Sequence, residues 1–161
     1  MSLALRPVSL ADQPFLFQVY ASTRAEEMAV VPWSEDQKQA FLQMQFNAQS
    51  QSYQQQFPGA EYSVILYDGV PAGRLTVERT DESILLIDIA LLPAHRNMGI
   101  GSSLIDDLKT EAQESGRPLR LDVENFNPAY RLYERLGFKK IDEASFYYRM
   151  EWRPSETATA V

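Results

Sequence analysis

The chain has no cysteine and only one histidine, His95, among its 161 residues. Without thiols it can form neither a disulfide nor a thiolate nucleophile, and a single imidazole excludes a metal site built from several histidines or cysteines. It also lacks the roughly twenty consecutive apolar residues of a membrane-spanning helix, and the basic flank and apolar core of a secretory leader. We therefore expect a cytoplasmic protein that needs neither a metal nor a membrane.

Basic charge is scarce as well, because the net charge is −7 at pH 7. A nucleic-acid-binding protein needs a basic face for the phosphates, so we expect no nucleic-acid partner. Acidic residues outnumber basic ones in the first part of the chain, whereas arginine and lysine gather in the second half. The first half could suit a cationic amine and the second a polyanion, although ordinary solvated surface charge explains most of these residues equally well.

The length predicts one domain over residues 1–153, because a chain of this size can bury about 70% of its unfolded surface. The small, polar residues 154–161 predict a mobile C-terminal tail. Asp68-Gly69 is typical of a hairpin turn. Hydrophobic periodicity and turn residues predict helices over 10–24, 35–54, 101–115 and 128–136, and strands over 3–8, 62–67, 71–79, 84–92, 119–124, 138–141 and 146–152.

The most informative segment is Arg96-Asn97-Met98-Gly99-Ile100-Gly101, which stands between an apolar strand and a predicted helix. A strand that enters a helix through two glycines leaves the first N–H groups of that helix unpaired, and such a site favours an anion. A mononucleotide-binding loop requires Lys-Ser or Lys-Thr where this chain has Ser102-Ser103, and a dinucleotide fingerprint requires a third small residue where it has Leu104. Neither nucleotide site fits, and a plain tight turn stays open.

The remaining pattern, Arg-x-x-Gly-x-Gly, resembles the acyl-CoA pyrophosphate loop of the GNAT superfamily of N-acetyltransferases. A second segment is similar to that family's Asn-Pro-Ala-x-x-Leu-Tyr-Glu-x-x-Gly-Phe: it reads Asn127-Pro128-Ala129-Tyr130-Arg131-Leu132-Tyr133-Glu134-Arg135-Leu136-Gly137-Phe138. The two segments occur in the family's order and at its usual separation. The resemblance spans nearly the whole chain. It implies the α/β (α+β) GNAT-like acyl-CoA N-acyltransferase fold: a mixed, mainly antiparallel sheet of about seven strands, splayed between the fourth and fifth and flanked by about four helices.

The resemblance implies that an acetyl group passes from acetyl-CoA to a primary amine of a small molecule or peptide, by direct attack through a tetrahedral intermediate. It assigns the coenzyme A pyrophosphate to Arg96, Asn97, Met98, Gly99, Ile100, Gly101 and Ser102, the pantetheine arm to Ile89, Ala90 and Leu91, and further cofactor contacts to Asn127 and Arg131. Asn127 before a proline is also an ordinary helix start, and Arg131 an ordinary surface residue. A non-catalytic acyl-CoA-binding or interaction module with the same fold is the alternative.

The same resemblance makes Tyr133 the general acid. A departing thiolate needs a proton, and a phenol with a pKa near 10 can supply one. Leu132, Tyr133 and Leu136 also form an apolar helix face, so core packing competes with this role.

The base that deprotonates the amine stays open among three carboxylates. Asp122 occupies the position where related peptide-amine acetyltransferases carry an acidic residue. Asp88 interrupts an apolar strand, an environment that raises a carboxylate's pKa and often marks function. Each of the two, like Glu78, could instead be an ordinary strand carboxylate. We expect His95 to be a solvent-exposed residue that leads into the glycine loop.

Acceptor recognition in this family lies in the loop between the first two helices, here about residues 25–34. Glu26 and Glu27 could hold a positive amine, and Trp33 could wall the acceptor slot or simply anchor the loop. This acidic loop mildly favours a small or cationic acceptor. The aromatic run Phe146-Tyr147-Tyr148 could extend the sheet across a homodimer, although aromatic strands are also common in monomers.

Overall fold

The computed structural model describes residues 2–155, so the predicted tail lies outside the described residues from position 156 onward. Seven strands form one mixed sheet, in the order β1 (Leu3–Pro7), β2 (Glu61–Tyr67), β3 (Val70–Arg79), β4 (Ile84–Leu91), β5 (Leu119–Glu124), β7 (Tyr147–Trp152) and β6 (Lys139–Glu143). The chain divides into two compact units. The first runs up to Thr76 and includes Asp88–Ile100, and the second holds Val77–Ile87 and the described residues from Gly101.

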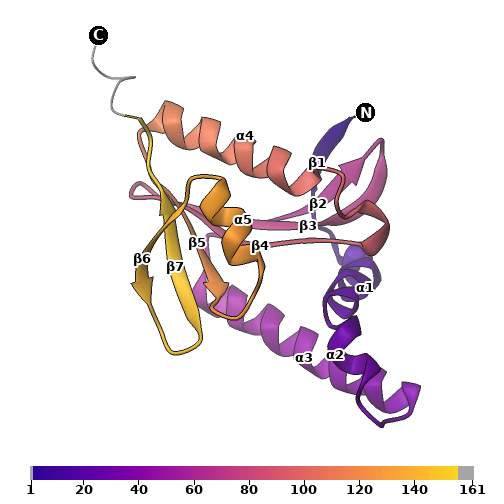
Figure 1. Ribbon diagram of the computed structural model, residues 1–161. Helices are drawn as coiled ribbons and strands as arrows, with labels where there is room; N and C mark the ends of the chain where they lie inside the picture. Colours follow the sequence, from indigo (N-terminus) through magenta and orange to yellow (C-terminus); the bar gives the residue numbers. More distant parts are fainter. Residues whose placement is uncertain (1, 156–161) are drawn as a thin grey trace. The chain divides into compact units, whose positions relative to one another are not determined.

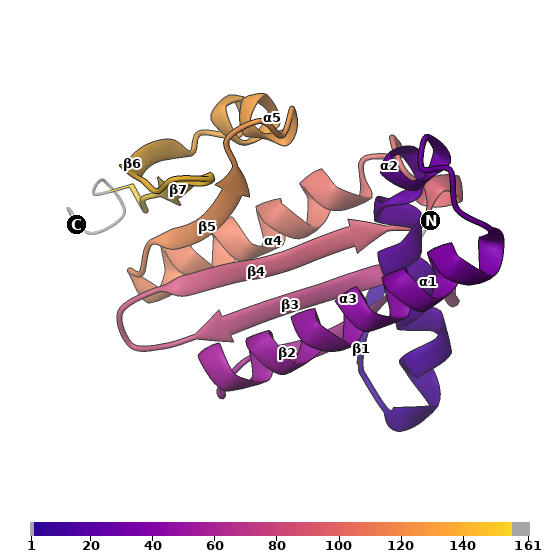
Figure 2. The ribbon, with the colours of Figure 1, turned by 90° about the horizontal axis from the view of Figure 1, so that it is seen from below.

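The first unit combines the start of the sheet with three helices, α1 (Gln13–Thr23), α2 (Ala25–Ala29) and α3 (Glu35–Gln56). Strands β1 and β2 pair in antiparallel register from Leu3↔Tyr67 to Pro7↔Ser63. The predicted hairpin turn is present, since Asp68 and Gly69 both have positive φ values, 49° and 80°. Figure 2 shows α3 running alongside β2 and β3.

The first predicted helix is shorter than expected and is followed by another. Residues Leu10–Asp12 form a single 3-10 turn, and α1 ends where Arg24 leaves the helical conformation with φ −106° and ψ 2°. Near this end Ser22 and Thr23 donate their hydroxyls to the carbonyls of Val19 and Tyr20, at 2.7 and 2.6 Å. Such side-chain bonds compete with the helical ladder. The expected acceptor loop therefore contains α2, and the described chain has five α-helices rather than four.

The core of the first unit lies among these three helices. Its buried members are Leu16, Tyr20, Met28, Leu42 and Phe46, and the ring of Phe17 packs edge-on against Phe46 at 5.8 Å. A capping box starts α3: the Gln37 amide donates to the Ser34 hydroxyl at 3.2 Å, and the Ser34 amide donates to the Gln37 side chain at 3.0 Å.

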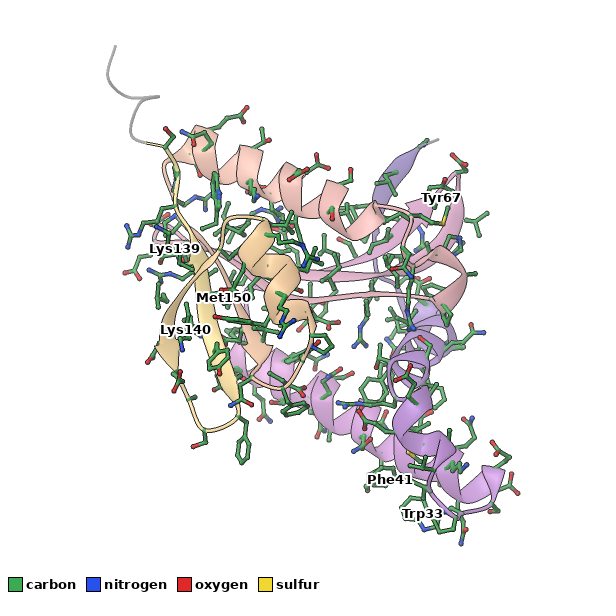
Figure 3. All side chains as sticks on the ribbon, in the orientation of Figure 1. Trp33, Phe41, Tyr67, Lys139, Lys140 and Met150 are labelled. Atoms are coloured by element: carbon green, nitrogen blue, oxygen red, sulfur yellow. The ribbon has the colours of Figure 1, made fainter. Side chains whose placement is uncertain are left out.

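The second unit contains β5, β7 and β6 with two helices, α4 (Ile100–Ser115) and α5 (Ala129–Arg135) (Figure 1). Strand β5 pairs in parallel with β4, from Ile84↔Leu119 to Leu86↔Leu121, and antiparallel with β7 along its whole length. Edge strand β6 is exposed throughout and has a bulge between Lys140 and Asp142. Met150 on β7 is fully buried, whereas the lysines of β6 reach solvent (Figure 3). Other core residues are Ile84, Leu86, Leu104, Ile105, Leu108, Leu119, Leu121, Val123 and Phe138.

This mixed sheet with helices confirms the fold that the resemblance implied. At the end of the described chain, Ser155 exchanges two hydrogen bonds with the Gln113 side chain on α4, at 2.7 and 3.1 Å. Between residues 2 and 155, the structure contains no helix with the length and apolar character that crossing a bilayer requires.

Candidate active site

The glycine loop connects the end of β4 to α4 through a 3-10 turn at Pro93–His95. Asn97 and Gly99 have φ values of 61° and 80°, in the left-handed region that glycine adopts without steric cost and asparagine tolerates best among the other residues. These two residues turn the chain into the helix that begins at Ile100. The first N–H groups of α4 have no partner within the helix. An added Cβ at Gly99 or Gly101 would meet no heavy atom within 4 Å, so the backbone is open on that side.

Arg96 binds protein groups at the start of this loop. Its Nε donates to the Leu91 carbonyl at 2.9 Å, and its Nη2 donates to the carbonyl and hydroxyl of Ser22, at 3.4 and 3.2 Å. The side chain therefore fastens the loop to the end of β4 and to α1. This is a structural role beside the one expected from the resemblance, which was a contact with the pyrophosphate.

The predicted pantetheine segment, Ile89 to Leu91, lies at the end of β4 with one edge against β3. The Leu92 amide donates to the Ala72 carbonyl at 2.8 Å. The carbonyl oxygen of Ala90 approaches Gly73 so closely that an added Cβ there would lie 2.1 Å from it. These groups of β4 face β3, and because backbone groups alternate along a strand, those of Ile89 and Leu91 face the opposite edge.

Asp88, directly before this segment, faces a cavity of about 370 Å³ in the first unit. The cavity is lined by residues of α1, α3 and the strands: Val8, Gln13, Leu16, Phe46, Gln49, Ser50, Tyr53, Gln54, Tyr62, Ser63, Arg74, Thr76 and Asp88. Asp88 Oδ2 and Arg74 Nε form an ion pair at 2.5 Å. Arg74 also donates to Gln49 Oε1 at 3.2 Å, and its guanidinium lies 5.7 Å from the ring centroid of Tyr20.

Burial controls the titration of the groups in this cavity. It raises the pKa of the Asp88 carboxyl above its ordinary value, and Arg74 opposes that shift by stabilising the carboxylate. Burial, with the Asp88 charge adding to it, raises the pKa of Tyr53 to about 12. Tyr53 is therefore a neutral hydrogen-bond donor at physiological pH.

The second unit holds the Tyr133 segment. Tyr133 lies half-buried on α5, with its ring edge-on to Phe138 at 5.9 Å. Asn127 precedes this helix and its side-chain oxygen accepts from the Ala129 amide at 2.9 Å, so it does cap α5. Asn127 and the exposed Arg131 line one hollow of this unit, together with Tyr130 and Tyr148.

Asp122 is held by a residue that the sequence analysis did not single out. Arg149 on β7 lies directly opposite it in the register, and its Nε and Nη2 donate to the two carboxylate oxygens at 2.9 and 3.0 Å. The Asp122 charge raises the pKa of Arg149, mainly through these bonds. The Asp122 side chain is 34% exposed, so it also remains accessible to solvent.

The predicted acceptor-binding residues lie on and after α2 in the first unit. Glu26 and Glu27 are exposed, and Glu27 pairs with Arg24 at 3.2 Å. Trp33 packs edge-on against Phe41 at 5.3 Å, which anchors the loop to the start of α3 (Figure 3).

The expectation of an exposed His95 was wrong in part. The residue is half-buried, and its ring lies edge-on to Tyr67, with ring centroids 5.8 Å apart. Tyr67 comes from β2, so the packing of this strand against the 3-10 turn at Pro93–His95 covers part of the imidazole.

Three residues of these sites escaped sequence reasoning: Arg74, Tyr53 and Arg149. Arg74 carries a weaker signal than Asp88, because it is a charged residue inside a strand that also holds Thr76 and Glu78. Tyr53 and Arg149 carry no comparable signal, since tyrosine is ordinary on a helix and arginine is ordinary on a strand near the sheet edge.

Comparison with known proteins agrees with this geometry. The sequence profile of the Acetyltransferase (GNAT) family matches residues 24–138. The chain is 38% identical over 64 residues to ribosomal protein bS18-alanine N-acetyltransferase of Haemophilus influenzae, a match that covers 39% of this chain and 44% of that protein. The match thus spans less than half of the relative's length.

Solved structures of N-acetyltransferases share the fold. The PaiA N-acetyltransferase of Thermoplasma acidophilum, in complex with coenzyme A, has a TM-score of 0.69 at 19% identity over 95% of this chain and 99% of that one. The ribosomal-protein-S18-alanine N-acetyltransferase of Escherichia coli has a TM-score of 0.63 at 21% identity over 96% and 95%.

Proposed function

Because the chain belongs to the acetyltransferase (GNAT) family, we propose that it is an N-acetyltransferase that moves an acetyl group from acetyl-CoA to a primary amine. The family and the named relatives support an acyl-CoA-dependent N-acyltransferase, as the sequence resemblance implied. The single observation that carries the proposal is the left-handed backbone of Asn97 and Gly99 at the entrance to α4. This conformation leaves the N-terminus of α4 open, a few residues after the end of β4.

The loop suits a diphosphate because its N–H groups are accessible and the helix dipole adds positive potential at its start. A Cβ added at Gly99 or Gly101 would meet no heavy atom within 4 Å, so the backbone is open on that side. Phosphate oxygens could therefore approach the amides of residues 97–102. Arg96, bonded to Leu91 and Ser22, keeps the start of the loop in place.

The edge of β4 suits the amide-bearing pantetheine arm. Ala90 and Leu92 face β3, so the backbone groups of Ile89 and Leu91 are directed to the other edge. An extended arm with amide groups can pair with such an edge as an added strand does. The Leu91 carbonyl already accepts from Arg96, which leaves the groups of Ile89 as the principal partners.

When bound, acetyl-CoA supplies a thioester carbonyl to the attacking amine. Asp122 takes the proton that the amine loses, directly or through water. Each of its oxygens accepts one bond from Arg149 and has a second acceptor position to spare. Tyr133 donates its phenolic proton to the sulfur as the carbon–sulfur bond breaks. Asp122 gains one proton and Tyr133 loses one, so both residues return to their starting protonation states by proton exchange with solvent.

The acceptor belongs to the class of primary amines. The Haemophilus relative is named for the alanine of a ribosomal protein, which makes a protein α-amine one candidate acceptor. A small-molecule amine is the other, and the exposed Glu26 and Glu27 favour a positively charged one.

Replacing Tyr133 with phenylalanine tests the catalytic assignment. We expect kcat to fall by about 100-fold or more, the usual contribution of a general acid, while the affinity for coenzyme A stays within about twofold. Asp122→Asn should lower kcat in the same assay, which measures thiol release over panels of small amines and peptides. Tyr147→Phe, an exposed tyrosine of the same unit, is the control. Unchanged turnover in Tyr133→Phe would remove it from the mechanism, and coenzyme A binding without amine-dependent thiol release would indicate a binding module.

A further inference from the structure

The cavity of the first unit has a polar floor and an open mouth. Gln13 and Gln54 at its rim are exposed, whereas Arg74 and Thr76 at its base are only 9% and 4% exposed. Asp88 completes the base and is the residue directly before the β4 edge proposed for pantetheine. The inner end of the cavity therefore lies next to the segment where the acetyl donor would lie.

The charges of this cavity neutralise each other. Arg74 and Asp88 are the two charged residues among those that line it, and they meet at 2.5 Å. The other polar groups of the wall are uncharged: the amides of three glutamines and the hydroxyls of serine, threonine and tyrosine. Tyr53 and Gln49 are close enough to the pair to interact with it, Tyr53 through the Asp88 charge and Gln49 by accepting from Arg74.

A charged ligand group has no counter-charge to meet in such a cavity. A carboxylate would have to share Arg74 with Asp88, and an ammonium would have to share Asp88 with Arg74. Either would leave the buried cavity with a charge that has no partner, which is strongly unfavourable. An uncharged amide or hydroxyl can instead exchange hydrogen bonds with the glutamine, serine and tyrosine side chains and leave the pair intact.

We infer that this cavity binds the non-reacting end of the acceptor and selects a primary amine whose far end is uncharged but forms hydrogen bonds, such as an amide. The inference rests on the proposed function for the reaction itself. It differs from the expectation that Glu26 and Glu27 favour a cationic acceptor, because those carboxylates do not line the cavity.

The test compares three amines of similar length: γ-aminobutyramide, γ-aminobutyrate and putrescine. Their far ends are neutral, anionic and cationic. Dissociation constants are measured by ligand-detected magnetic resonance titration of the free protein, without acetyl-CoA. We expect γ-aminobutyramide to bind at least about tenfold more tightly than either charged amine. Equal or tighter binding of a charged amine by the wild-type protein would overturn the inference.

Variants that change the charge of the cavity provide a second test of the inference. Asp88→Asn leaves Arg74 unpaired and should shift the preference to γ-aminobutyrate, whereas Arg74→Gln leaves Asp88 unpaired and should shift it to putrescine. Either single change can destabilise the fold, so the double variant Arg74→Gln/Asp88→Asn is included as the matched control. Its cavity is neutral again, and the preference for the amide should return. An unchanged order of affinities in folded single variants, or loss of the amide preference in the folded double variant, would contradict the inference.

Coenzyme A binding and amine acetylation, measured beside this titration, separate the two proposals. If the protein fails to bind coenzyme A, the proposed function fails, but the order of the three amines is still measurable. If coenzyme A binds and amines are acetylated without preference for the neutral far end, the proposed function stands and the cavity assignment is wrong.

Discussion

Replacing Gly99 with alanine is the most direct test of the glycine loop. Gly99 has a φ of 80°, and a residue with a Cβ adopts this left-handed conformation at a cost of about 1–2 kcal/mol. The cost is purely conformational, because an added Cβ would meet no heavy atom within 4 Å. Any loss of affinity must then come from the backbone conformation and not from a steric clash within the protein.

The expected loss of coenzyme A affinity follows from comparing the loop in the free and the bound protein. In the free protein an alanine at position 99 can relax the strain by moving the exposed loop, whereas a bound diphosphate would require the left-handed conformation again. The strain therefore opposes binding, and we expect the affinity for coenzyme A to fall by about 5- to 30-fold.

The chain offers a matched control in Gly69. It has the same φ of 80° and the same open surroundings, but it lies in the β2–β3 hairpin. Gly69→Ala should lose stability without losing affinity. Both variants are compared by calorimetric titration with coenzyme A and by urea unfolding. If Gly99→Ala binds coenzyme A as tightly as Gly69→Ala does, the loop conformation is not used in binding and the reasoning behind the proposed site is refuted.

Two further predictions concern stability. Arg6 and the Ser9 amide, bonded to the Asp12 carboxylate at 2.7–2.9 Å, hold its pKa well below the usual range. The stability that this pair contributes is present above a pH of about 4 and is lost as the pH falls below it. The difference in urea midpoint between wild type and Asp12→Asn should therefore shrink on acidification. A difference that stays constant with pH would contradict this prediction. Gly73→Ala would place a Cβ 2.1 Å from the Ala90 carbonyl oxygen and should lower the free energy of unfolding in urea by about 2–3 kcal/mol. Gly101→Ala, with open space around the added Cβ, should not lower it. Equal stability of the two variants would show that β3 and β4 separate freely.

The features that depend on neighbouring residues were predictable. The hairpin at Asp68-Gly69 and the turn at Gly99 follow from steric preferences and hydrogen bonds within a few residues of chain. The strand pattern was predictable for the same reason, and the fold that the two motifs implied was confirmed. The short helix α2 was not predictable, because its five residues are too few to show a helical period in the sequence.

The pairing of distant charges could not be predicted. The sequence shows that Asp88 is an unusual residue for an apolar strand, but its partner Arg74 becomes visible only when β3 and the helices enclose one cavity. Asp122 likewise looks like a carboxylate without a partner until the β5–β7 register places Arg149 opposite it. Strand register and helix packing depend on the whole sheet, so short stretches of sequence do not encode them.

The sequence by itself determined the family, the order of the strands along the chain and the local shape of the glycine loop, because each of these is set by a few consecutive residues. Only the tertiary structure decided which charges neutralise each other, which backbone edge of β4 faces away from β3 and which cavity Asp88 faces. Those properties arise when segments far apart in the chain are held side by side, and that arrangement then determines what the site can bind.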